Sequence, residues 1–249
     1  MHRLLPPFLA LLILLPSLAA AETVRFGLRE APPLVQTMPD GQLRGLEFEL
    51  LTAIFAAADL QIDPYLGSNA RLALAAGEGA VEGFAPVVGM PPDGLYLTDS
   101  YITYHNVAVT LATRGIRLER PGDLRGLRVL AFQRAGKVLG PEFADAILDA
   151  ADYREEPVQA LQAKGLLYGR YDVLIGESRV LMYNINQVLT AAGEGGRGLP
   201  VVEHRLFAPN HYRAGFRDPV LVARFNQGLS RIRADGSYQA ILNRYDPTQ

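Results

Sequence analysis

Short runs of apolar residues alternate along the chain with segments whose apolar residues recur every three or four positions. The runs have the length and composition of buried strands, and they occupy residues 23–28, 80–88, 105–111, 127–132, 172–176 and 199–206. The segments with helical spacing include residues 46–55, 181–189 and 221–232. Strands that alternate with helices predict an α/β fold with mainly parallel sheets that are covered by helices on both faces.

The alternation restarts midway along the chain, which predicts two sheets instead of one. The strand at residues 105–111 runs into a polar stretch at residues 113–120, and a new series of strands begins beyond it. Ligands of open α/β sheets bind beyond the carboxyl ends of the strands. Two lobes that face each other turn that edge into a cleft, so we expect binding residues at strand ends.

The first 21 residues have the pattern of a secretory signal peptide. A basic start precedes an apolar run at residues 4–15, and small residues precede a predicted cleavage after Ala21. A membrane anchor is the alternative, but the apolar run is short, contains prolines and is followed by no basic cluster. We therefore expect an exported, soluble chain of residues 22–249 that does not insert into a membrane.

Composition removes several classes of function. The chain has no cysteine, which excludes disulfides, thiol catalysis, cysteine-based zinc sites and a lipid-modified N-terminal cysteine. Its 24 Lys and Arg residues against 26 Asp and Glu residues give a formal net charge of −2, which argues against nucleic acid as a partner. The histidines lack the spacing of metal ligands on one helix face, so no metal and no cofactor are expected. A glycine-rich stretch at residues 193–198 follows a predicted helix, the wrong order for a dinucleotide site, and predicts a surface loop.

Several motifs occur in an order and spacing that resemble a known family. A Pro-Pro turn follows the first strand, and further motifs lie at residues 45–50, 79–82, 97–101, 123–129, 171–177 and 233–238. Together they cover essentially the whole chain beyond residue 22. The chain is similar to the family 3 periplasmic solute-binding proteins, the polar amino-acid receptors of ABC transporters.

The resemblance implies a type II periplasmic-binding-protein fold, in which two α/β lobes joined by a two-strand hinge close on a ligand. Lobe 1 would comprise residues 22–111 and 207–249, and lobe 2 residues 112–206. The resemblance also implies a monomer in the periplasm, without a lipid anchor, that captures a small polar, amino-acid-like solute. Its partner would be the membrane subunits of an ABC permease.

The same resemblance points to six candidate ligand-binding residues at strand ends and turns. They are Glu30, Asn69, Arg71, Phe132, Arg134 and Glu177. Glu177 lies where the family has an aspartate that receives the ligand's α-ammonium, and a carboxylate there would form a charge-assisted hydrogen bond. The alternative for Glu177 is a residue at the start of a helix, where the helix dipole favours a negative charge, and both roles can hold together.

The family's usual anchor for the ligand carboxylate is missing from this chain. Family members carry an arginine in the loop after the fourth strand, but residues 89–94 form a shorter loop without a basic residue. Because a guanidinium group is the best match to a carboxylate, Arg71 and Arg134 are the candidate replacements. The alternative for both is a solvated surface arginine.

Two pairs of residues are expected to have structural roles. Tyr101 and Tyr104 are predicted to pack under the hinge instead of against the ligand. Glu47 and Glu49 lie two positions apart on a helix and therefore point in different directions. We expect them to be solvated or capping residues and not a catalytic pair.

Two other functions stay open beside a non-enzymatic transport receptor. A sensor or accessory binding protein would use the same cleft without a dedicated transporter. An enzyme that resembles the cyclohexadienyl dehydratases would use Glu30 or Glu177 as a general acid on the same fold. The sequence offers no clear pairing of such an acid with a substrate clamp, so we predict a protein that is not an enzyme.

Overall fold

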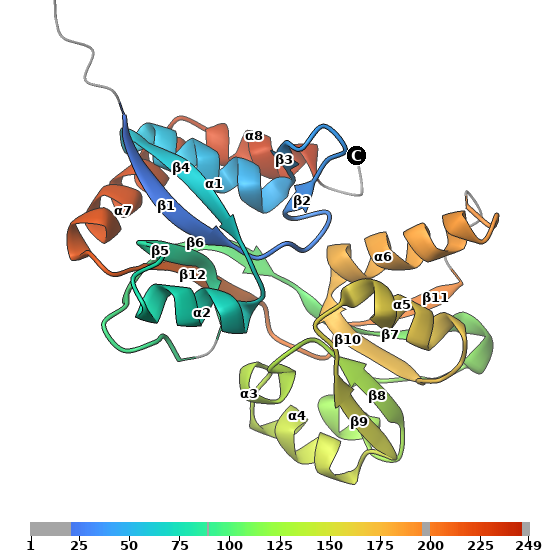
Figure 1. The fold of residues 1–249 in the computed structure, drawn as a ribbon. Coiled ribbons are helices and arrows are strands. Elements are labelled where there is room, and N and C mark those ends of the chain that lie inside the picture. The colour runs from blue at the N-terminus through green and yellow to red at the C-terminus, as the bar shows by residue number, and fades with distance from the viewer. Residues whose placement is uncertain (1–20, 89, 196–199, 246–249) are drawn as a thin grey trace, which may run out of the picture.

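The computed structural model describes residues 21–88, 90–195 and 200–245, and these form two α/β lobes, each around a five-stranded sheet (Figure 1). This confirms the predicted fold class. The predicted signal peptide lies outside the described residues except for Ala21, and so does the end of the glycine-rich stretch at residues 193–198. Within the described ranges, no helix has the length and apolar character needed to cross a lipid bilayer.

Lobe 1 combines the N-terminal part of the chain with its C-terminal part. Its sheet has the order β4-β1-β5-β12-β6. The strands are β1 (Glu22–Leu28), β4 (Leu60–Leu66), β5 (Gly83–Val87), β6 (Tyr96–Tyr104) and β12 (Asn210–Phe216), and β2 (Gln36–Thr37) pairs with β3 (Leu43–Arg44) in a separate ribbon. The helices are α1 (Leu46–Ala57), α2 (Asn69–Gly77), α7 (Pro219–Ala234) and α8 (Ser237–Arg244). Helix α2 lies across the sheet from α1 and α8 (Figure 1).

Lobe 2 is formed by the middle of the chain. Its sheet has the order β11-β7-β10-β8-β9. The strands are β7 (Asn106–Leu111), β8 (Arg128–Ala131), β9 (Asp152–Glu155), β10 (Val173–Glu177) and β11 (Val201–His204). The helices are α3 (Ala135–Val138), α4 (Pro141–Ala146), α5 (Gln159–Leu167) and α6 (Ser178–Ala191), and short 3-10 turns lie at Ala112–Arg114, Pro121–Leu124 and Ile147–Asp149. The pair α5 and α6 packs on one face of this sheet, and α3 and α4 pack on the other.

Four phenylalanines form the centre of lobe 1. Phe26 from β1, Phe55 from α1, Phe216 from β12 and Phe225 from α7 are each at most 1% exposed. The ring centroids of Phe26 and Phe55 are 5.1 Å apart, and those of Phe216 and Phe225 are 5.7 Å apart. Burial of each ring contributes roughly 1.5–3 kcal/mol to folding. The cluster therefore packs α7 against β1.

The sheets are less parallel than the sequence predicts. In lobe 1, β1 is parallel to β4 and β5, whereas β12 is antiparallel to β5 and β6. In lobe 2, β8 is parallel to β9 and β10, whereas β7 is antiparallel to β10 and β11. A parallel connection needs a crossover such as a helix. The chain instead passes between the lobes in extended form and enters the next sheet directly, which produces the antiparallel pairs.

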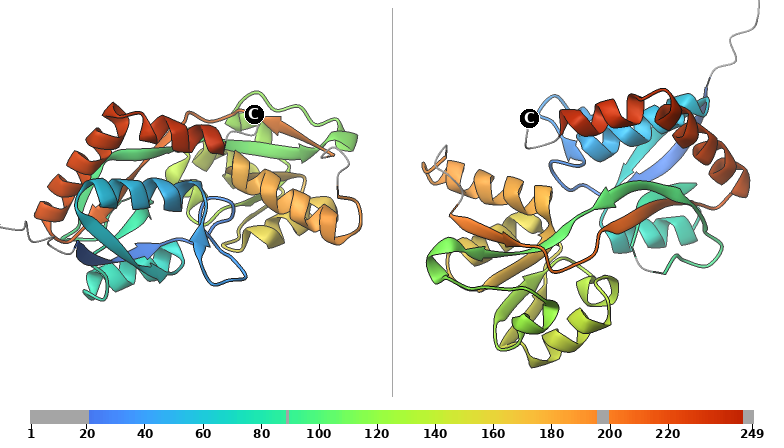
Figure 2. Two further views of the ribbon diagram at one scale, coloured as in Figure 1. Left: turned by 90° about the horizontal axis from the view of Figure 1, so that it is seen from above. Right: turned by 180° about the vertical axis from the view of Figure 1, so that it is seen from behind.

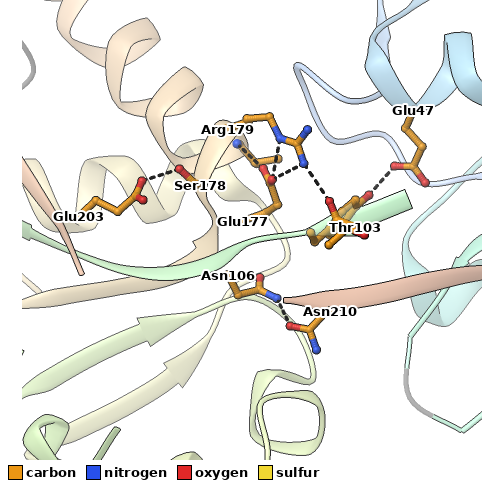
Figure 3. A network of polar contacts seen from close by, with 10 residues as sticks. Glu47, Thr103, Asn106, Glu177, Ser178, Arg179, Glu203 and Asn210 are labelled. Carbon is orange, nitrogen blue, oxygen red and sulfur yellow. Dashed lines mark hydrogen bonds and ion pairs between the residues drawn. The ribbon is translucent and has the colours of Figure 1, made fainter. Parts of the chain in front are cut away.

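Two extended segments connect the lobes, and they run side by side (Figure 2, right). The first crossing is at His105, between β6 and β7, and the second lies between β11 and β12. The Asn106 side-chain amide donates a hydrogen bond of 2.7 Å to Oδ1 of Asn210, which joins the two crossings (Figure 3). Residues 106–111 pair with the lobe 2 sheet, although lobe 1 was expected to extend to residue 111. The apolar pattern continues through both strands and does not reveal where the pairing changes.

Candidate ligand-binding cleft

A cavity of about 650 Å³ lies between the lobes, beside the carboxyl ends of parallel strands. Lobe 1 contributes the residues that follow β1 and β4, and lobe 2 contributes those that follow β8 and β9, together with Asn184 of α6. Three of the predicted binding residues, Glu30, Asn69 and Phe132, line this cavity. The structure thus brings them together from both lobes, while their contact with a ligand stays a prediction.

Asn69 carries a polar atom without a partner. It is the first residue of α2 and is 6% exposed, and its Oδ1 atom has no hydrogen-bond partner among the described residues. The neighbouring Ser68 caps the helix, because its hydroxyl accepts a hydrogen bond of 3.3 Å from the backbone N–H of Arg71. An unsatisfied buried acceptor costs about 1–3 kcal/mol. A donor on a bound solute would remove that penalty.

Arg29 is the cleft residue that sequence reasoning missed. It directly follows β1 and lines the same cavity, and its Nε atom is buried without a hydrogen-bond partner in the described part of the chain. Burial alone lowers the pKa of a guanidinium, but nearby Tyr104 and Glu47 outweigh burial, so the pKa of Arg29 is raised. Arg29 therefore stays charged. The one signal in the sequence was its place next to Glu30 at a strand end.

Glu47 is held in the interior of lobe 1 by two tyrosines. The hydroxyls of Tyr101 and Tyr104 donate hydrogen bonds to different oxygens of its carboxylate, and all three residues are at most 3% exposed. Burial raises the pKa of Glu47, although the tyrosine hydroxyls and Arg29 oppose this shift. The expectation that Glu47 is solvated or capping is therefore wrong, because two donors compensate a buried carboxylate. Both tyrosines are buried, and Tyr104 directly precedes the crossing at His105.

Glu177 is already engaged within the protein. Its Oε2 atom accepts a hydrogen bond of 3.0 Å from the backbone N–H of Val180 and so caps α6, and its Oε1 atom accepts one of 2.7 Å from Arg179. Arg179 also donates to the carbonyl oxygen of Thr103 in β6 at 3.2 Å (Figure 3). Glu177 is 3% exposed and lines a separate cavity of about 740 Å³ beside α8. Glu177 thus has the predicted role at the start of a helix. Its contact with a ligand stays a prediction.

The two arginines predicted as replacement anchors lie apart from each other. The Nε atom of Arg71 donates a hydrogen bond of 2.9 Å to the Tyr65 hydroxyl, and its guanidinium lies 5.6 Å from the centre of the Tyr65 ring. Arg134 lines a smaller cavity of about 340 Å³, which Asn69 also borders, and its backbone N–H donates to Glu155 at 2.6 Å. A role of either arginine in binding stays a prediction.

The arrangement agrees with what comparison to known proteins finds. No protein-family model matches the chain. An L-arginine-binding protein of Pseudomonas aeruginosa is 24% identical over an alignment of 249 positions, which covers 95% of this chain and 93% of that protein. Among solved structures, an ancestral arginine-binding protein bound to arginine matches with a TM-score of 0.73 at 16% identity, over 91% of this chain and 99% of that one.

A second solved structure has the same architecture. A histidine kinase sensor domain with similarity to periplasmic binding proteins matches with a TM-score of 0.74 at 21% identity, over 92% of this chain and 97% of that one. At such identities the structures establish a shared fold. The chain has the two-lobed fold of the periplasmic binding proteins and is similar over most of its length to an L-arginine-binding protein.

Proposed function

We propose that the protein is a non-enzymatic solute-binding protein that closes its two lobes on an amino-acid-like solute. The observation that carries this proposal is the cavity of about 650 Å³ that both lobes line with charges of both signs. Pockets for small molecules typically measure about 300–1,000 Å³. Arg29 offers a positive charge, and Glu30 and Glu156 offer negative ones, so the cavity has counterparts for both ends of a zwitterion.

The charges of the cavity favour a solute with a positive net charge. Glu30 accepts a hydrogen bond of 3.1 Å from the backbone N–H of Thr37 through Oε1, and Glu156 accepts one of 2.8 Å from that of Val158 through Oε1. Each carboxylate therefore keeps an oxygen for a ligand. A cavity with two carboxylates and one guanidinium suits a solute that carries two basic groups and one acid group. A cationic amino acid such as L-arginine is the first candidate, in line with the ligand named for the Pseudomonas aeruginosa relative.

We further propose that the protein is exported to the periplasm and delivers its solute to the membrane subunits of an ABC permease. The signal-like pattern at residues 1–21 and the resemblance to transporter receptors support this placement. Hinged closure would give the permease two distinguishable states, a loaded and an empty receptor. A monomer is sufficient for such a cycle, because both halves of the cleft come from one chain.

A thermal-shift panel of amino acids, amines and organic acids tests the function, followed by calorimetric titration of the best ligand. L-Arginine or another cationic amino acid should raise the melting temperature, because a ligand at 100 times its Kd adds about 2.7 kcal/mol of stability. Mass spectrometry should recover the ligand chemically unchanged. If no solute of the panel raises the melting temperature, the proposal fails.

Matched glutamate variants place the binding in this cavity. Glu156→Gln removes a charge that lines the cavity, and Glu142→Gln removes one from an exposed position of α4 in the same lobe. We expect Glu156→Gln to weaken the binding of a cationic amino acid about 10-fold, because one charge-assisted hydrogen bond is lost. Glu142→Gln should leave the affinity unchanged. Equal affinities of the two variants would contradict the assignment of Glu156.

A further inference from the structure

We propose that Arg29 is the residue that binds the acid group of the solute, from the end of the first strand of lobe 1. This inference rests on the proposed function and specifies one half of the site. Residues 90–94 offer no basic side chain, and the sequence contains no Lys or Arg between Arg71 and Arg114. An acid group in the cleft therefore needs a cation from another element of the fold.

Arg29 is the cation that lines the cavity of about 650 Å³. Among the described residues that line this cavity, Arg29 carries the one positive charge. The guanidinium of Arg71 is turned to Tyr65, and Arg134 lines the smaller cavity. A guanidinium is planar and presents several N–H donors, so it fits a carboxylate through two parallel hydrogen bonds.

The surroundings keep Arg29 charged and leave a donor of its side chain free. Glu47 is close enough to favour the charged guanidinium, but the Glu47 oxygens accept hydrogen bonds from Tyr101 and Tyr104. The Arg29 Nε atom consequently has no partner in the described part of the chain, although it is buried. Buried polar groups in native proteins are nearly always hydrogen-bonded. Arg29 lines the cavity and has an unpaired side-chain donor, so an acid group bound there can supply the missing acceptor.

Asn69 offers a hydrogen-bond acceptor that complements the donor of Arg29. It lines the same cavity, is 6% exposed and has a buried Oδ1 atom without a partner among the described residues. Arg29 lacks an acceptor and Asn69 lacks a donor. A solute with an acid group and an ammonium group on one carbon can satisfy both. This combination identifies the recognised chemistry as the α-amino acid head group.

A cycle of protein and ligand changes tests the proposal by calorimetric titration. The probes are L-arginine and agmatine, which is L-arginine without its carboxylate. We expect Arg29→Gln to weaken the binding of L-arginine about 10- to 100-fold, which is the range of one or two charge-assisted hydrogen bonds. The affinity for agmatine should change by less than about threefold, because agmatine lacks the carboxylate that Arg29 would contact.

Arg25→Gln is the matched control, because Arg25 lies on β1, the strand that Arg29 follows, is exposed and packs against the Tyr65 ring. It should bind L-arginine like the wild type. If Arg29→Gln leaves L-arginine binding unchanged, or weakens both probes equally, the role of Arg29 is refuted while the proposed function stands. If the wild type binds no amino acid at all, the proposed function itself fails.

Two further variants keep the test decisive if Arg29→Gln does not fold. Arg29→Lys keeps the charge that faces Glu47 but loses the planar fork, so L-arginine should bind about 10-fold more weakly and agmatine equally well. The double variant Arg29→Gln with Glu47→Gln removes both charges together and avoids an uncompensated buried carboxylate. It should show the same selective loss of L-arginine binding. Wild-type affinity in either folded variant would overturn the proposal.

Discussion

At the scale of single residues, two glutamates of α1 lie two positions apart and have opposite surroundings. Burial raises the pKa of Glu47 more than its tyrosine partners lower it. For Glu49, burial is the largest single influence and raises the pKa, but the hydrogen bonds from Tyr245 and Arg244 and the positive charges nearby together outweigh it, so the pKa is lowered. The folded protein therefore holds a proton on Glu47 more tightly than the unfolded chain does, and holds one on Glu49 less tightly.

These shifts predict opposite pH dependences of stability. The stabilising effect of the raised pKa of Glu47 is complete below the unfolded value of 4.5 and is lost as the pH rises through the folded value. The free-energy advantage of the wild type over Glu47→Gln should therefore shrink as the pH rises above 4.5. For the matched variant Glu49→Gln, the advantage should shrink as the pH falls below 4.5. Urea unfolding of the wild type and both variants, at pH values on either side of 4.5, measures both free-energy differences. A stability advantage of the wild type over Glu47→Gln that grows with pH would contradict the account.

The same residues show what the sequence could not provide at this scale. The spacing of Glu47 and Glu49 on a helix correctly separates their directions, but it does not show that Tyr101 and Tyr104 supply donors from a distant strand. Arg29 was missed for the same reason, since its burial depends on residues far along the chain. Glu30, Asn69 and Phe132 were candidates because of the family resemblance, which carries information about the cleft that the local pattern does not contain, and they do line the cavity.

At the scale of elements, the contact between α1 and α7 depends on a glycine. A Cβ atom at Gly228 of α7 would overlap the carbonyl oxygen of Ile54 in α1. The two helices therefore pack closely only because this position has no side chain. The helical spacing of residues 46–55 predicted the buried face of α1, but no pattern in the sequence showed which helix would cover it.

Alanine substitutions at two helical glycines test this packing. Gly228→Ala should destabilise the protein by about 1–3 kcal/mol, because the overlap forces the helices apart. Gly77→Ala in α2 meets no atom within 4 Å and should be neutral or stabilise the protein by up to about 1 kcal/mol through helix propensity. Chemical denaturation of both variants provides the comparison. A Gly228→Ala protein as stable as the wild type would show that α1 and α7 are not in tight contact.

At the scale of the whole molecule, the two lobes share the cleft, the crossings and several polar contacts. Asn106 and Asn210 join the crossings, and Arg179 of α6 donates to the Thr103 carbonyl of β6 (Figure 3). The two-lobe plan follows from the restart of the strand pattern, which the sequence contains. The position of the first crossing does not follow from the strand pattern, because His105 alone separates β6 from β7.

The central claim is that one amino-acid-like solute binds between the lobes. Native mass spectrometry of the protein in an equimolar mixture of L-amino acids tests it most directly. We predict a complex of one protein with one cationic amino acid, which weakens both in Glu30→Gln of lobe 1 and in Glu156→Gln of lobe 2. The absence of any bound amino acid, or a complex that persists unchanged in both variants, would contradict the account.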